Sequence, residues 1–223
     1  MTINKRTERT VAVLFLLATV AFMTGSGLID SVLNQPDYLS HLYPNRMKVT
    51  IGLFLELLNS AAVVGIAILM LPILKQHNQP IAYGYLSSRI IESVLLIGGT
   101  ICPILLVALS KQYISDGGAA NSHFPIIGDL ILVAQNNAFE LAMIALSLGS
   151  LMFCYLLYRT RLIPRTLSLL GLVGYMALLF SSCLSIIGLD PGMLLFIPGG
   201  LFELIFPIWL IVKGFVPRSD GSN

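Results

Sequence analysis

The sequence predicts an all-α polytopic membrane protein, folded as a bundle of six transmembrane helices. Of its 223 residues, 56% are hydrophobic and only 11% are charged, and the mean hydropathy is +0.87. Soluble domains carry about 25% charged residues, so this deficit places the chain in a membrane. Six apolar runs are long enough to cross a bilayer core, which takes about 20 residues. Each run is expected to be a helix, because a segment surrounded by lipid must satisfy its own backbone hydrogen bonds.

The first apolar run has features of both a signal peptide and a membrane helix. Residues 1–10 form a polar leader with three basic residues, and the small polar residues at 24–27 resemble a cleavage region. The apolar character resumes after these residues and continues to Leu33. We therefore expect an uncleaved first span over residues 11–33.

Five further spans follow, separated by connections that contain polar residues, glycine or proline. They are expected at about residues 50–74, 81–109, 129–158, 162–189 and 194–212. A polar loop at 34–49 and a surface loop within 110–128 are expected between spans, and the short segment 190–193 makes the last two spans a hairpin. Residues 11–216 are thus expected to form a single transmembrane domain, followed by a polar tail at 217–223.

Lysine and arginine residues in the connections predict the orientation of the chain. Nine of them belong to the leader, the tail and the connections on one side, against three on the other side. Basic residues favour the cytoplasmic side, so we expect both termini in the cytoplasm of a bacterial cell and the spans in its plasma membrane. The nine are Lys5, Arg6, Arg9, Lys75, Arg159, Arg161, Arg165, Lys213 and Arg218, and the three are Arg46, Lys48 and Lys111.

Charged residues near the middle of the bilayer form the first candidate site. Arg89 and Glu92 lie three residues apart in the third span, so their side chains can meet on one helix face. Glu92 and Glu203 each lie about 15 Å from the cytoplasmic ends of their helices, given the rise of about 1.5 Å per residue. A charged group inside a bilayer costs about 2.5 to 3.5 kcal/mol on insertion scales. Arg89, Glu92 and Glu203 are therefore predicted to form an intramembrane polar site.

Glu203 also lies at a predicted weak point of its helix. Pro207 has no N–H group, so the carbonyl of Glu203 loses its helical partner. Because Pro-Gly-Gly at 198–200 precedes the carboxylate, we expect the sixth helix to be kinked or interrupted near it. A Gly-Gly pair at 98–99, ahead of a proline, predicts a similar weak point in the third span.

A second candidate site is expected nearer the outer interface. Glu56 and Glu140 lie far along their spans from the basic residues that close them on the cytoplasmic side. Helical spacing places amide side chains next to these carboxylates. The predicted outer vestibule comprises Glu56, Asn59, Asn136, Asn137 and Glu140.

Both groups also have structural interpretations. Arg89 and Glu92 could be a buried ion pair that fixes helix register, and the amides could be hydrogen-bond partners between helices. Glu56 and Glu140 could be interfacial residues that reach water. However, four in-span glutamates against one arginine leave at least two carboxyl groups without a cation, to be protonated, solvated or bound to a ligand.

Other functional classes have little support. The net charge of +2 is divided among the loops and does not indicate a nucleic-acid partner. The three cysteines lie in apolar runs without CxxC spacing, so neither a disulfide framework nor a zinc site is expected. The histidines are expected in loops and lack HExxH spacing, and an outer metal site of His41 and His123 with Asp37 or Asp129 is a weaker alternative. No cofactor, metal or catalytic residue is predicted.

Several motifs carry a resemblance to a known family. They are Leu-Leu-Tyr-Arg-Thr-Arg-Leu-Ile-Pro-Arg at 156–165, Leu-Gly-Leu-Val-Gly-Tyr at 170–175, Ser-Arg-Ile-Ile-Glu at 88–92, and the ending at 202–215, which opens with Phe-Glu-Leu. In these motifs the chain resembles the multi-pass bacterial membrane proteins grouped as domain of unknown function 4386, over nearly its whole length. The resemblance implies a membrane topology with the first helix retained, and it implies no particular activity.

These observations favour a small transporter or permease-like protein whose polar core handles a proton or a small solute. The alternative is a non-transporting membrane partner or sensor, in which polar residues fix helix packing and the outer loops bind another protein. A membrane-embedded enzyme is a third hypothesis, but the sequence lacks the nucleophile–base or metal-ligand spacing that would support it.

Overall fold

The computed structural model describes residues 5–117, 123–189 and 192–215, and within these ranges all the regular structure is helical. Six segments of the described chain are long and apolar enough to cross a membrane, so the predicted fold class is confirmed. They are α1 (Lys5–Leu33), α3 (Arg46–Lys75), α4 and α5 together (Gln79–Gly99 and Ile101–Ser115), α6 (His123–Thr160), α7 (Arg165–Ile186), and η1 with α8 (Met193–Phe196 and Ile197–Val212). A short helix, α2 (Tyr38–Leu42), lies between the first two spans.

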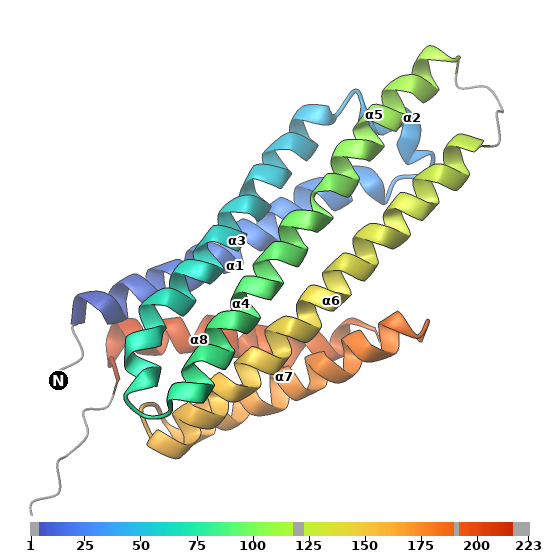
Figure 1. Cartoon of the computed structure of the whole chain (residues 1–223). Helices are drawn as coiled ribbons and strands as arrows, with labels where there is room; N and C mark the ends of the chain where they lie inside the picture. The colour runs from blue at the N-terminus through green and yellow to red at the C-terminus, as the bar shows by residue number, and fades with distance from the viewer. Residues whose placement is uncertain (1–4, 118–122, 190–191, 216–223) are drawn as a thin grey trace, which may run out of the picture.

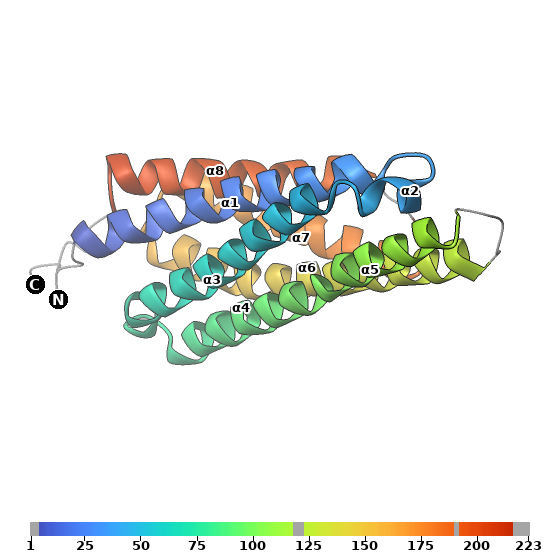
Figure 2. The ribbon, with the colours of Figure 1, turned by 90° about the horizontal axis from the view of Figure 1, so that it is seen from above.

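The six spans form a closed ring in which each span packs against its neighbours in the chain. The contacts run from α1 to α3, α4, α6, α7 and α8 in turn, and α8 packs back against α1. Figures 1 and 2 show the start of α1 and the end of α8 at one end of the bundle, which we call the terminal end. The turns between α3 and α4 and between α6 and α7 also lie there, whereas α2 lies at the opposite end, called the α2 end.

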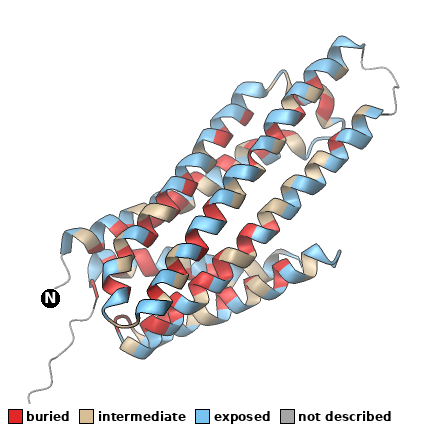
Figure 3. Cartoon of the chain, in the orientation of Figure 1, coloured by how far each residue is buried: buried red, intermediate tan, exposed pale blue. Residues whose placement is uncertain are grey.

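The outer faces of the ring are apolar and exposed. Buried residues follow the faces on which the helices pack together, and the outward faces are exposed over most of their length (Figure 3). Large side chains such as Val20, Val94, Leu130 and Phe180 are each more than half exposed. A soluble monomer rarely exposes so much apolar surface, whereas lipid tails solvate it well.

Close helix contacts depend on glycine at three crossings. A methyl group at Gly52 of α3 would lie 2.7 Å from the backbone oxygen of Gly25 on α1. One at Gly174 of α7 would lie 2.7 Å from Cα of Gly199 on α8, and one at Gly149 of α6 would overlap a side chain of α4. Lipid is as apolar as leucine, so helices in a membrane associate through close packing and polar contacts. The missing side chains allow that packing.

The two ends of the described chain are joined by a carboxylate. Glu8, near the start of α1, is buried and accepts a hydrogen bond from the backbone N–H of Phe215 at 3.1 Å. Gly214 has a φ of 70°, and a Cβ there would lie 2.7 Å from Oε2 of Glu8. A side chain at 214 would therefore be strained and would displace the carboxylate.

The segment 34–49 is not a loop throughout, which corrects the expectation from sequence. It contains α2, whose Leu39 and Leu42 are buried, and the start of α3. The hydroxyl of Ser110 on α5 donates to the carbonyl of Leu39 and accepts the N–H of Tyr43 at 2.9 Å. The spacing of three between the two leucines puts both on one side of a single helical turn.

The connection at 110–128 is also largely helical, since α5 extends to Ser115 and α6 begins at His123. His41 and His123 consequently belong to helices, not to loops. Residues 118–122 of the connection with the expected surface loop lie outside the described residues, as do residues 1–4 of the leader, 190–191 of the last turn, residue 216 and the tail at 217–223.

The two predicted weak points have different outcomes. The one at 98–99 is confirmed, because α4 ends at Gly99 and α5 begins at Ile101, while the hydroxyl of Thr100 donates to the carbonyl of Ile97 at 2.7 Å. We expected the sixth helix to be kinked or interrupted near Glu203. The interruption is wrong, since α8 is one helix from Ile197 to Val212, and the kink stays a prediction. Pro198 occupies the first turn, where the missing N–H needs no helical partner, so it begins the helix.

The α1–α3 crossing generates a stability prediction. Gly52→Ala should destabilise the protein by about 1–3 kcal/mol, because the new methyl group meets backbone that has no room to move away. Gly27→Ala is the matched control, since nothing lies within 4 Å of its Cβ position. The control should be neutral or slightly stabilising, because alanine favours a helix by up to about 1 kcal/mol over glycine. Thermal unfolding of the purified variants checks this, and equal shifts for both would contradict the proposed close contact.

Candidate functional site

A cavity of about 310 Å³ lies inside the ring, and every span contributes to its wall. Most of the wall is apolar, with side chains such as Phe22 from α1, Ile66 from α3, Met143 from α6 and Leu178 from α7. Polar groups enter it from five of the spans. The polar lining consists of Thr19, Asn59, Arg89, Glu92, Tyr175 and Glu203. The structure thus brings Arg89, Glu92 and Glu203 to one cavity, although α4 and α8 are not neighbours in the ring.

Arg89 is neutralised by residues of its own helix. Its Nη1 lies 2.8 Å from Oε2 of Glu92, and the two residues are only 4% and 3% exposed. Its Nε donates to the hydroxyl of Tyr85 at 3.4 Å, and the guanidinium carbon lies 5.4 Å from the centre of the tyrosine ring. The ion pair follows the spacing of three read from the sequence. The tyrosine adds a cation–π contact, which strengthens when water is excluded.

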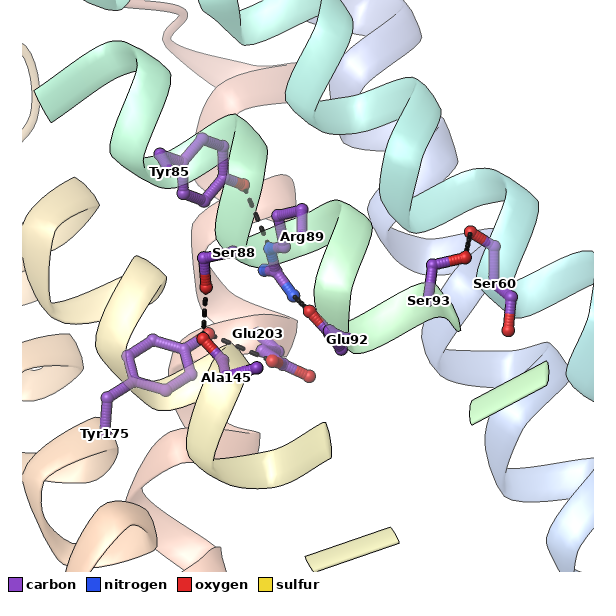
Figure 4. Close-up of polar contacts among 9 residues, drawn as sticks. All are labelled: Ser60, Tyr85, Ser88, Arg89, Glu92, Ser93, Ala145, Tyr175 and Glu203. Atoms are coloured by element: carbon purple, nitrogen blue, oxygen red, sulfur yellow. Dashed lines mark hydrogen bonds and ion pairs between the residues drawn. The ribbon is translucent and has the colours of Figure 1, made fainter. Parts of the chain in front are cut away.

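Glu203 has a different environment, because its hydrogen-bond partner is neutral. The hydroxyl of Tyr175 on α7 donates to Oε1 of Glu203 at 2.9 Å (Figure 4). Within the described part of the chain, no basic side chain forms a salt bridge with this carboxylate. The nearby cation is Arg89, which acts on Glu203 electrostatically but is already bonded to Glu92. The cavity therefore holds one more carboxyl group than it holds cations.

The backbone around Glu203 adds a second acceptor. Pro207 lies inside α8 and has no N–H, so the carbonyl of Glu203 has no donor four residues later. The close contact between Gly174 and Gly199 lets α7 and α8 approach just before Tyr175 and Glu203. That approach is what puts the tyrosine hydroxyl within hydrogen-bond distance of the carboxylate.

A layer of buried aromatic rings lies on the side of the cavity nearer the terminal end. Phe206 is the central ring, with its centroid 5.3 Å from Phe15, 5.6 Å from Phe153 and 5.3 Å from Phe202. Tyr85 stacks on Phe153 with a centroid distance of 4.9 Å. We call these five residues the aromatic layer. All five are at most 4% exposed, so the rings are shielded from solvent.

The cavity reaches the outer surface of the ring between α1 and α8. Met23 on α1 and Leu204 on α8 line the cavity, and they are 65% and 41% exposed. Gly200, also on the wall, is exposed and carries no side chain to cover the opening. In a bilayer, an opening on this side faces lipid.

The predicted outer vestibule is only partly present. A small pocket of about 50 Å³ adjoins the cavity and is lined by Glu56 and Asn59, and Asn59 also lines the cavity. The remaining polar lining is Gln135 from α6. Glu56 on α3 lies close enough to Asp30 on the neighbouring helix α1 for the two carboxyl groups to interact electrostatically.

Three residues assigned to that vestibule lie elsewhere. Asn136 and Asn137 are exposed and line neither space, which corrects their assignment. Gln135 and Phe139 face the small pocket, and a helix turns about 100° per residue, so the two asparagines point away from it. Glu140 is buried at 7% exposure but also lines neither space, and its Oε2 has no hydrogen-bond partner among the described residues.

Two tyrosines of the site were not assigned to it from sequence. Tyr85 and Tyr175 lie on polar helix faces, but nothing in the sequence paired the second with Glu203 across two helices. A signal exists in the glycines at 171 and 174, which precede the tyrosine and predict a close helix contact. The described residues contain no group of three or more His, Cys, Asp or Glu side chains arranged to hold a metal ion.

A ring of six spans around an internal polar cavity defines the chain as a multi-pass α-helical membrane protein. A family model described as Domain of unknown function (DUF4386) matches residues 10–214, so the chain belongs to this family and the resemblance seen in its motifs is confirmed. No curated protein and no solved structure matches the chain.

The Arg89–Glu92 pair generates a coupling prediction. Glu92→Gln should destabilise the protein by about 3–5 kcal/mol, because it leaves a buried guanidinium without its counter-ion. The double variant Arg89→Gln/Glu92→Gln should lose less, since it strands no charge. Chemical unfolding of the two single variants and the double variant measures the coupling, and strictly additive losses would show that the two residues act independently.

Proposed function

We propose that the protein is a small permease-like transporter whose polar core carries a proton or a small solute. The observation that supports this is Glu203, a carboxyl group on the wall of a cavity built by all six spans and bonded to a hydroxyl instead of a cation. Intramembrane carboxyl groups that face a cavity commonly mark ion or substrate pathways.

A packing role accounts less well for the arrangement. The Arg89–Glu92 pair is self-contained within α4, and a structural ion pair needs no cavity beside it. Glu203 instead faces open space and is held in position by the hydroxyl of Tyr175. A carboxyl group in this position can take up and release a proton without disturbing the ion pair.

We further propose that the protein lies in the bacterial plasma membrane with both termini in the cytoplasm. The α3–α4 turn, the α6–α7 turn, the start of α1 and the end of α8 all lie at the terminal end (Figure 2). Nine basic residues belong to these segments and the two termini, against three at the α2 end. This asymmetry favours the cytoplasm for the terminal end.

Proton flux through Glu203 is testable in liposomes. Purified protein is reconstituted with a pH-sensitive dye inside, and a potassium gradient with an ionophore supplies the driving potential. We expect Glu203→Gln to lower the protein-dependent flux at least about tenfold, because an amide carries no exchangeable carboxyl proton. Glu140→Gln is the matched control, since Glu140 is also a buried in-span glutamate but does not line the cavity.

The control should retain most of the wild-type flux. A wild-type flux no higher than that of empty liposomes would reject proton transport, and equal flux in both variants would remove Glu203 from the mechanism. If Glu203→Gln changed stability alone, the non-transporting partner or sensor hypothesis would be favoured instead.

The orientation can be tested with single cysteines. Cys102, Cys154 and Cys183 are first replaced by alanine, and Gln76→Cys or Gln35→Cys is then introduced at an exposed position. In intact cells, a membrane-impermeant maleimide should label position 35 and should reach position 76 only after the membrane is opened. Labelling of position 76 in intact cells would reverse the proposed orientation.

A further inference from the structure

We propose that the cavity binds a cationic amphiphile, namely a protonated amine with a compact apolar body, and that the ammonium group lies at Glu203. This inference rests on the proposed function for the identity of the site and adds the chemical class of the ligand.

The charges of the cavity favour a cationic head group. Arg89 is bonded to Glu92 at 2.8 Å, so it has little attraction left for an anionic ligand. Glu203 has only the Tyr175 hydroxyl as its partner and is the carboxyl group in excess. Placing an ammonium beside it would balance one cation and one anion inside the membrane, which lowers the cost of a buried charge.

The acceptors at Glu203 also suit an ammonium group. The hydroxyl of Tyr175 is bonded to Oε1 of Glu203. The acceptors that remain for a ligand are Oε2 and the backbone carbonyl of Glu203, which Pro207 leaves without a helical partner. An ammonium group has donors alone and no acceptors, so it can bond to such atoms without competing for the tyrosine hydroxyl.

The rest of the cavity favours an apolar body. Beyond the polar cluster the wall is formed by phenylalanine, leucine, isoleucine, valine and methionine side chains. The volume of about 310 Å³ is at the lower end of the range for small-molecule sites. A sugar or another strongly polar solute would leave its own polar groups unpaired against this wall, which is costly.

The access route is consistent with a membrane-soluble ligand. The cavity opens between α1 and α8, where Met23 and Leu204 are both lining and exposed. The aromatic layer lies on the side of the cavity nearer the terminal end. An amphiphile dissolved in the bilayer can enter by the open side with its apolar body still in contact with apolar groups.

A matched set of compact ligands tests the charge preference. Adamantylamine, adamantanol and adamantanecarboxylate share one apolar body and differ in a positive, neutral or negative head. Binding of each to the full-length protein is measured by thermal stabilisation in nanodiscs of phosphatidylglycerol. We expect the amine to bind at least about tenfold tighter than the alcohol, in line with the strength of hydrogen bonds to charged groups, and the carboxylate to bind weakest.

The variants locate the binding site. Glu203→Gln should abolish the preference for the amine over the alcohol, whereas Glu140→Gln should retain it. Unfolding of the unliganded variants shows that each is folded before its binding is compared. Equal affinity for amine and alcohol, a preference for the carboxylate, or an unchanged preference in Glu203→Gln would each overturn the proposal.

Repeating the measurement in phosphatidylethanolamine identifies the source of the head group. The ratio of amine binding in the wild type to that in Glu203→Gln, measured in the same lipid, cancels the attraction of the amine to the membrane surface. A smaller ratio in phosphatidylethanolamine would assign the site to the ammonium of a membrane lipid, and an unchanged ratio would assign it to a free amine; both results support an ammonium site. Failure of this proposal is distinct from failure of the transport proposal. Proton flux that depends on Glu203 can persist without any amine preference, and the preference can exist in a protein that transports nothing.

Discussion

The interaction on which the rest of the bundle depends is the burial of one guanidinium group. Arg89 is 4% exposed inside a membrane span, where an unpaired charge is costly. Glu92 and Tyr85 satisfy it from the same helix, one turn to either side. Two serines that flank the arginine then attach α4 to its neighbours: Ser88 donates to a backbone carbonyl of α6, and Ser93 donates to the carbonyl of Ser60 on α3 at 3.2 Å. The charge is thus enclosed by helices on both sides of α4 (Figure 4).

The packing that holds the ring together also builds its polar site. Apolar side chains gain little by leaving lipid for the protein interior, so close backbone contact and interhelical hydrogen bonds stabilise the bundle. At Gly174 and Gly199 that contact draws α7 against α8, and the result is the hydrogen bond from Tyr175 to Glu203. A substitution that separated these helices would therefore affect the site without touching either of its side chains.

The hydropathy of the chain was sufficient to predict the six spans, because their length and composition are set by the bilayer and not by tertiary contacts. The Arg89–Glu92 pair was predictable for a related reason, since both residues lie on one helix with fixed geometry. Contacts between helices were harder to predict. No pattern in the sequence specifies the rotation of α6 that turns Asn136 and Asn137 outward and Gln135 inward. The interruption of α8 was predicted wrongly because a Pro-Gly-Gly sequence can start a helix as well as interrupt one.

The aromatic layer has a consequence for the membrane voltage. An electric potential across a bilayer falls mainly over the regions that contain neither water nor mobile charge. If water joins the cavity to the α2 end, the voltage falls largely across the buried rings around Phe206. A charge that moves between the cavity and the α2 end then crosses little of the field. A charge that passes the rings crosses most of it, which is worth about 2.3 kcal/mol per elementary charge at 100 mV.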